Sequence, residues 1–252
     1  MKPTLPLVIA HRGASAETPE NTIAAFERAV ELGAEAIELD VQVTRDGVPV
    51  VTHNDDLSIL TGYKGFVHAV PFSTIRELDA GSHFGKKWKD EKIPTLADAL
   101  TLIGHHRLRV IIEIKQQPLA VAEAVARIGE IVVPLASSIA MTIASFSPKI
   151  LLEMKRLFPE LPRALIINRG PLARARSART ARRVDSHTIM APYAAPLGSL
   201  VRQAHRVGRS IYVWTVNKPE LVPQCLAMQV DGIITDNVAM VKKHLYSPPH
   251  YG

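Results

Sequence analysis

Short apolar runs alternate with amphipathic stretches along most of the chain. Continuous apolar runs predict strands buried on both faces, and apolar residues spaced three or four apart predict helices. The predicted strands are Leu7–Ala10, Ala36–Val43, Val48–Thr52, Leu108–Ile114, Ile139–Ser145, Ala164–Ile167, Thr188–Ala191, Ser210–Val216 and Gly232–Thr235. The predicted helices are Asn21–Leu32, Leu96–Ile103, Leu119–Ile131, Pro148–Phe158, Leu197–Val207 and Pro219–Met228.

This alternation predicts an α/β fold with a parallel sheet covered by helices. The pattern gives close to eight β/α units in 252 residues, which is about the length of a TIM barrel. We therefore expect residues 1–252 to form a single TIM-barrel domain. The alternative is a doubly wound open sheet, which normally carries a glycine-rich nucleotide turn after its first strand. Here His11-Arg12-Gly13 follows that strand instead.

Residues 56–94 interrupt the alternation of predicted strands and helices, because they are rich in glycine and proline and show weak periodicity. We expect an insertion after the second β unit, helical around Ser73–Leu78. Its five aromatic residues are Tyr63, Phe66, Phe72, Phe84 and Trp88. Because the segment follows His53, we expect a lid or side wall, with Phe84 and Trp88 as substrate contacts; the alternative is a small satellite core. The tail, Ser247–Gly252, is predicted to fray.

The net charge of +6 suits phosphate-bearing substrates, nucleic acid or an anionic membrane surface. Six arginines fall between Arg169 and Arg183 without interleaved aromatics, which favours a solvated helix face or loop over a nucleic-acid site. Cys225 is the only cysteine, so we expect no intrachain disulfide and place it in the core. The apolar run near the N-terminus is too short for a leader or a membrane span, which predicts a cytoplasmic protein without stable membrane insertion.

Two carboxylates, Glu38 and Asp40, lie two residues apart in an apolar strand. Alternate residues of a strand share a face, so these like charges repel unless a counter-charge is present. A hard divalent cation, which prefers oxygen ligands, would supply that charge. Glu113 and Lys115 repeat the pattern two strands later, although alone they could form a structural ion pair.

Other polar residues follow further strands: His11, Arg12, His53, Trp214, Asn217 and Asp236. The carboxyl ends of all strands meet at one mouth of a β/α barrel, so these residues should converge there. Histidines beside a metal suggest acid–base chemistry. Trp214 is a candidate substrate contact, although taken singly it could be a core residue. Taken singly, His11 could be a hydrogen-bonded loop residue.

The combined motifs resemble those of glycerophosphodiester phosphodiesterases along nearly the whole chain. They are His11-Arg12-Gly13, Pro19-Glu20-Asn21-Thr22, Glu38-Leu39-Asp40-Val41, Thr44-Arg45-Asp46-Gly47, His53, Ile93-Pro94-Thr95-Leu96, Glu113-Ile114-Lys115, Trp214-Thr215-Val216-Asn217 and Asp231-Gly232-Ile233-Ile234-Thr235-Asp236. The chain departs from the family pattern at Asn54, at Ile59-Leu60-Thr61 and at Asn237-Val238.

The resemblance implies a TIM barrel with one divalent metal ion, Mg²⁺ or Ca²⁺, bound by Glu38, Asp40 and Glu113. It further implies that His11 and His53 act as the acid–base pair and that Arg12 and Lys115 hold the phosphate. The substrate would be a small glycerophosphodiester, hydrolysed to sn-glycerol 3-phosphate and an alcohol, and no nucleic acid is expected as a partner. Head-group preference, the order in which the histidines act and oligomeric state stay open.

Three alternatives remain at this point. A lyase of the sphingomyelinase D type shares the metal and histidine pattern but is secreted and disulfide-bearing. A Schiff-base aldolase could use Lys115 but has no need of three carboxylates. The third alternative is an inactive phosphodiester-binding protein, against which the complete set of histidines and carboxylates argues.

Overall fold

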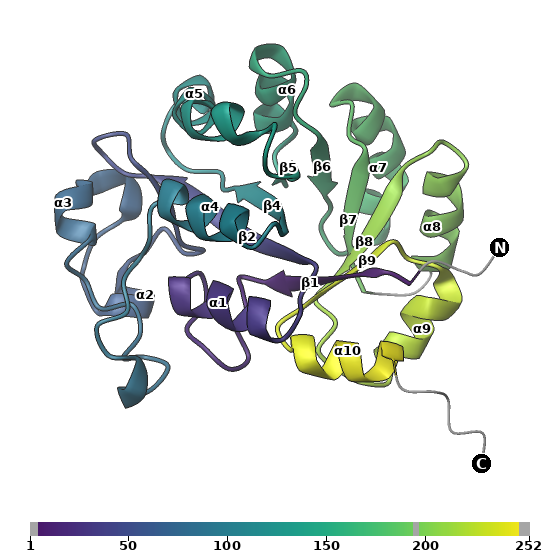
Figure 1. The fold of residues 1–252 in the computed structure, drawn as a ribbon. Helices are drawn as coiled ribbons and strands as arrows, with labels where there is room; N and C mark the ends of the chain where they lie inside the picture. The colour runs from purple at the N-terminus through teal and green to yellow at the C-terminus, as the bar shows by residue number, and fades with distance from the viewer. Residues whose placement is uncertain (1–4, 194–196, 247–252) are drawn as a thin grey trace.

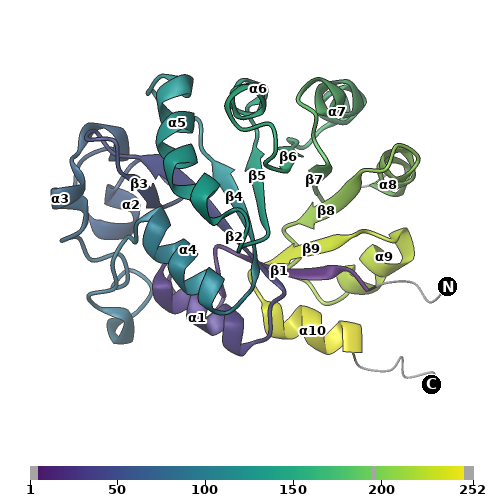
Figure 2. The same cartoon turned by 45° about the horizontal axis from the view of Figure 1, so that its top comes forward.

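The computed structural model describes residues 5–193 and 197–246, and one closed sheet forms its centre. Eight strands pair in parallel in the order β1-β2-β4-β5-β6-β7-β8-β9, and β9 pairs with β1 again. Figures 1 and 2 show the helices around the outside of these strands. The fold is a TIM barrel, which confirms the predicted fold class and excludes the open doubly wound sheet.

The strand bounds lie close to the predicted apolar runs. They are β1 Leu7–His11, β2 Ala36–Val43, β3 Pro49–Val51, β4 Arg109–Ile114, β5 Met141–Ser145, β6 Arg163–Ile166, β7 Thr188–Pro192, β8 Ser210–Trp214 and β9 Gly232–Thr235. Strand β3 does not belong to the barrel. It runs antiparallel to β2, after the turn that contains Asp46 and Gly47.

Ten α-helices and three short 3₁₀ segments occur in the described part of the chain. The helices are α1 Ile23–Glu31, α2 Ser58–Thr61, α3 Phe72–Ile75, α4 Leu96–His105, α5 Val121–Val132, α6 Pro148–Leu157, α7 Pro171–Arg183, α8 Leu197–His205, α9 Leu221–Met228 and α10 Val238–Tyr246. The 3₁₀ segments are η1 Val67–Ala69, η2 Lys86–Trp88 and η3 Val133–Leu135.

Alternate residues of the strands separate two apolar regions. Val8 and Ala10 of β1 pack in the outer core between sheet and helices, whereas Ile9 points into the barrel. Ile9, Ile111 and Ile234 belong to the inner cluster that fills the middle of the barrel. This filled middle separates the two ends of the barrel, so that polar residues can gather at either end.

Residues 56–94 form the predicted insertion, which lies to one side of the barrel beyond β3 (Figures 1 and 2). Its small core is mainly aliphatic and includes Leu57, Val67 and Ile75, with Phe72 packed at its edge. Tyr63, Phe66 and Phe84 are exposed. The helix expected around Ser73–Leu78 begins one residue earlier, at Phe72, and ends at Ile75.

Two features of the outer layer bear on the sequence predictions. Arg176, Arg179, Arg182 and Arg183 are exposed on α7, as a solvated helix face requires. Cys225 is buried on α9, and burial raises the pKa of its thiol to about 11, which suits a core residue.

Within the described residues, no helix has the length and apolar character needed to cross a membrane. The tail Ser247–Gly252 lies outside the described residues.

Candidate active site

The polar residues predicted to converge do meet at the carboxyl ends of the barrel strands. A cavity of about 100 Å³ lies there, above the inner apolar cluster. Its polar lining comes from His11, Arg12, Glu38, His53, Glu113 and Lys115. Its apolar lining comes from Phe146, Ile166, Met190, Trp214 and Ile234. Side chains from β1, β2 and β4 therefore share one space with a histidine that follows β3.

Three buried carboxylates form the acidic centre of this site. Asp40 of β2 lies in register with Glu113 of the neighbouring strand β4, and Glu38 precedes Asp40 on the same face. One oxygen from each of the three residues lies within 4.8 Å of the other two. The parallel register of β2 and β4 thus builds the cluster that the sequence spacing predicted.

The counter-charges around this cluster are unevenly distributed. Lys115 Nζ lies 2.8 Å from Glu113 Oε1 and 3.3 Å from Asp40 Oδ1, and Arg12 Nε lies 3.1 Å from Asp40 Oδ2. Burial alone would raise the pKa of Asp40, but Lys115 and Arg12 outweigh it and lower that pKa. In contrast, burial and the charge of Asp40 raise the pKa of Glu38 to about 8.

The cluster fits a hard divalent cation. All three side chains offer oxygen ligands, which Mg²⁺ and Ca²⁺ prefer over nitrogen or sulfur. Two oxygens on opposite sides of one Ca²⁺ are roughly 5 Å apart, since each Ca²⁺–O distance is about 2.3–2.6 Å. The raised pKa of Glu38 means that the two cationic side chains leave this carboxylate short of positive charge. A bound cation would supply it.

The carboxylate of Asp236, which directly follows the last barrel strand, β9, holds His11 in place. The Nδ1 atom of His11 lies 2.6 Å from Asp236 Oδ1, and the Nε2 atom of His11 lies 4.0 Å from Glu38 Oε2. Ser15 Oγ and Asn217 Nδ2 also donate to Asp236, at 3.1 and 2.5 Å. Burial lowers the pKa of His11, but the bond to Asp236 and the charge of Glu38 outweigh burial, so the pKa is raised.

His53 has a different environment from that of His11. Its Nδ1 lies 3.1 Å from Asn54 Oδ1, and its backbone carbonyl accepts a hydrogen bond from Gln42 Nε2 at 3.1 Å. Burial and the positive charges of Arg12 and Lys115 lower the pKa of His53, and the opposing effect of Asp40 is smaller than their sum. His11 therefore binds a proton more readily than an unperturbed histidine, and His53 binds one less readily.

Comparisons with known proteins agree with this geometry. The model of the glycerophosphoryl diester phosphodiesterase family matches residues 11–240, which is most of the chain. The chain belongs to this family. The match confirms the family resemblance and the predicted class, a phosphoric diester hydrolase.

Relatives of the chain in this phosphodiesterase family are similar along almost their full length. A glycerophosphodiester phosphodiesterase of Caldanaerobacter subterraneus is 37% identical over 92% of this chain and 94% of its own. A putative glycerophosphodiester phosphodiesterase of Bacillus subtilis is 34% identical over 91% and 93%. Among solved structures, an Oleispira antarctica phosphodiesterase in complex with the product sn-glycerol 3-phosphate has a TM-score of 0.88 at 27% identity, and covers 96% of this chain and 98% of its own.

Sequence reasoning did not assign several polar residues that support the site. Asn21 donates from Nδ2 to Asp40 Oδ2 at 3.0 Å, and Glu20 accepts two hydrogen bonds of 3.0 Å from Arg12 Nη1. Arg12 and Asn21 both have φ of 57°, in the left-handed region that few non-glycine residues adopt. Glu20, Asn21 and Asp236 all lie inside motifs typical of this phosphodiesterase family. That location was the available signal, but their partners are not visible in the sequence.

The three predicted aromatic contacts differ in their positions. Trp214 lines the cavity and packs edge-to-face with Phe146, their ring centroids 5.8 Å apart. Phe146, which directly follows β5, was not predicted. Phe84 and Trp88 of the insertion are not among the residues that line the cavity. Their contact with substrate therefore stays a prediction, and would require the insertion to change its position or a substrate to extend toward it.

Proposed function

We propose that the chain hydrolyses glycerophosphodiesters to sn-glycerol 3-phosphate and an alcohol, with one divalent metal ion and two histidines. The observation that carries the proposal is the cluster of Glu38, Asp40 and Glu113, two members of which, Glu38 and Glu113, line a cavity together with His11 and His53. Membership of the family supports the reaction class, and the sn-glycerol 3-phosphate complex of the Oleispira antarctica phosphodiesterase supports the product.

Glu38, Asp40 and Glu113 would hold the metal, which is Mg²⁺ or Ca²⁺ in this proposal. When bound, such an ion polarises a phosphoryl oxygen and offsets the charge that develops in the transition state. Arg12 and Lys115 line the same cavity and would share the phosphate charge. Both cations are already fixed by carboxylates, Arg12 by Glu20 and Lys115 by Glu113, so their positions are set before substrate arrives.

The two histidines would transfer the protons. In phosphodiester hydrolysis one group takes a proton from the attacking oxygen while another protonates the leaving oxygen. His11 and His53 both line the cavity, and their pKa values are displaced in opposite directions. A pair of titratable groups separated in this way provides one proton acceptor and one donor at the same pH.

Lys115 is poorly suited to the alternative Schiff-base chemistry. An amine nucleophile must lose its proton, but here the carboxylates of Asp40 and Glu113 outweigh burial and raise the pKa of Lys115. The single cysteine argues against the disulfide-bearing lyase of the sphingomyelinase D type. A cytoplasmic location, where cysteines stay reduced, remains part of the proposal for the same reason.

The decisive experiment measures release of sn-glycerol 3-phosphate from glycerophosphocholine, glycerophosphoethanolamine and glycerophosphoglycerol. Activity should require Mg²⁺ or Ca²⁺, disappear with EDTA and return when metal is added. His11→Ala and His53→Ala should each lower turnover by about 10²-fold or more, since general acid–base groups contribute on the order of 10²–10⁴-fold. His205→Ala is the matched control, because His205 also pairs with an aspartate, Asp231, but outside the cavity.

Two results would refute the proposal. Full turnover in EDTA after exhaustive metal removal would exclude the metal, and normal turnover in either cavity histidine variant would remove that histidine from the reaction. Absence of product from all three glycerophosphodiesters, in a protein that still binds sn-glycerol 3-phosphate, would favour an inactive phosphodiester-binding protein.

A further inference from the structure

A second cavity lies at the opposite end of the barrel, where the strands begin. It has a volume of about 700 Å³ and is lined by residues at the starts of several strands, among them Leu7 of β1, Arg109 of β4 and Met141 of β5. Proteins bind small molecules in cavities of about 300–1,000 Å³. The cavity is therefore large enough for a ligand, and the inner apolar cluster separates it from the candidate active site.

Small residues leave the space open at this end. Ala36 of β2 is the neighbour in register of both Ile9 and Arg109, and its methyl group fills little of the barrel. Gly232 of β9 has no side chain, which lets the ring of Tyr212 lie against its backbone, at a point where a Cβ would be only 2.7 Å from the ring. Side chains normally fill the interior of a TIM barrel in complete layers. Here the lowest layer is incomplete.

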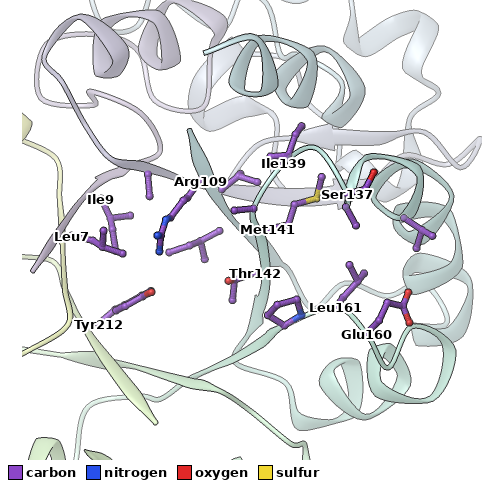
Figure 3. A pocket seen from close by; sticks show the side chains of 17 residues that line it. Leu7, Ile9, Arg109, Ser137, Ile139, Met141, Thr142, Glu160, Leu161 and Tyr212 are labelled. Atoms are coloured by element: carbon purple, nitrogen blue, oxygen red, sulfur yellow. The ribbon is translucent and has the colours of Figure 1, made fainter. Parts of the chain in front are cut away.

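Arg109 supplies positive charge to this space. It lies two residues before Ile111 on β4, and Ile111 belongs to the inner cluster, so Arg109 faces the interior end of the barrel rather than the helices. Figure 3 shows its guanidinium on the same side of the cavity as the hydroxyl groups of Tyr212 and Thr142. Within residues 5–193 and 197–246, no carboxylate lies within ion-pair distance of this guanidinium.

The rest of the lining is mostly apolar, with Ile9, Ile111, Met141 and Leu161 among the residues that contribute. Glu160 is the one acidic residue in the lining, and Figure 3 places it at the end away from Arg109. A ligand with a negative group at Arg109 and a long apolar part would match both surfaces. A second negative group at the far end would meet Glu160 and be repelled.

We propose that this cavity binds a singly charged carboxylate with an unbranched alkyl chain, the carboxylate on Arg109 and the chain along the apolar lining. The planar guanidinium pairs with a carboxylate through two parallel hydrogen bonds. A single arginine suits one carboxylate better than a doubly charged phosphate, which proteins usually surround with several donors. Tyr212 and Thr142 would donate further hydrogen bonds, while the Tyr212 hydroxyl already interacts with Thr188.

The test is calorimetric titration of the whole protein with decanoate below its micelle-forming concentration. The proposal expects saturable binding of one decanoate, with affinity at least tenfold weaker in Arg109→Gln and intermediate between the two in Arg109→Lys, which keeps the charge but loses the two parallel hydrogen bonds. Ala140→Phe places a ring at an exposed residue of the lining and should weaken binding at least tenfold while Arg109 remains. Decyltrimethylammonium and inorganic phosphate should not bind at this site.

Two controls separate this cavity from the candidate active site. Saturating sn-glycerol 3-phosphate should leave the affinity for decanoate unchanged, and Arg109→Gln should keep the phosphodiesterase turnover of the parent. The proposal is overturned if decanoate does not bind, if Arg109→Gln and Ala140→Phe bind it with the affinity of the parent, or if sn-glycerol 3-phosphate displaces it. Melting temperatures of the variants, measured without ligand, verify that each comparison involves folded protein.

Discussion

Asp236→Asn is the substitution that tests most directly how the site positions His11. In the parent, the carboxylate accepts from Ser15 Oγ and from Asn217 Nδ2 while it pairs with His11 Nδ1 at 2.6 Å. An asparagine side chain has the same shape but only one accepting oxygen. His11 and Ser15 both lie on Oδ1 and Asn217 lies on Oδ2, so the NH₂ group would take the Oδ2 position and lose the bond from Asn217, while the oxygen that faces His11 loses its negative charge.

The expected size of the effect follows from the lost charge on the acceptor that faces His11. A hydrogen bond to a charged group contributes about 1.5–3 kcal/mol, and 1.4 kcal/mol corresponds to a factor of ten. We therefore expect kcat to fall by roughly 10- to 150-fold, with little change in KM, because Asp236 does not line the cavity. The pKa of His11 should also fall, since the bond to Asp236 is what opposes burial.

The assay is steady-state release of sn-glycerol 3-phosphate, combined with nitrogen-resolved NMR of the His11 ring to report which ring nitrogen carries the proton. Asp231→Asn is the matched control, because Asp231 forms a 2.8 Å pair with His205 away from the cavity. In a His11→Ala background, Asp236→Asn should cost less than threefold more. Our reasoning would be refuted by an unchanged kcat in the single variant or by a full additional loss in the His11→Ala background.

Three further predictions address the metal, the insertion and the outer core. Glu38→Gln should abolish stimulation of turnover by Mg²⁺ or Ca²⁺, and full metal-dependent activity would exclude this ligand. Phe84→Ala or Trp88→Ala should change the ranking of head groups by kcat/KM or raise KM; identical values in both would make the insertion purely structural. Arg163→Met should lower the free energy of unfolding in urea by about 3–5 kcal/mol, because Arg163 is buried and its loss leaves three backbone carbonyls without their donor, at about 1–3 kcal/mol for each buried one. The exposed Arg156→Met should change it by less than about 1 kcal/mol, and equal effects would contradict this.

The fold could be predicted because the barrel strands are buried on both faces and read as continuous apolar runs. Ala36–Val43 matches β2 and Gly232–Thr235 matches β9 at both ends, and the remaining strands differ from their predicted runs by one or two residues at an end. Helix α7 was predicted only as a solvated helix face or a loop, because its arginine-rich sequence has no long apolar stripe. The apolar run of β3 gives no information on its direction, but the dipeptide Asp46-Gly47 is typical of a tight turn between two strands, and β3 does run antiparallel to β2 after it.

The candidate site was predictable where chemistry and spacing coincide on one strand. Glu38 and Asp40 are two residues apart, so their shared face follows from strand geometry alone. The pair formed by His11 and Asp236 spans 225 residues of sequence, and only the closure of the barrel shows that they touch. The positions of Phe84 and Trp88 depend on how the insertion packs, which its weak periodicity left undetermined.

The pairing of β1 with β9 has a consequence for the growing chain. His11 is made near the start of synthesis and Asp236 near its end, on the two strands that close the ring. Until β9 is added, the bond that orients His11 cannot form, and a nascent chain that already carries all three carboxylates of the proposed metal site still lacks this part of the site. This protein would therefore become catalytically active only after the barrel is complete, and a truncated or partly degraded chain that lacks β9 would be inactive.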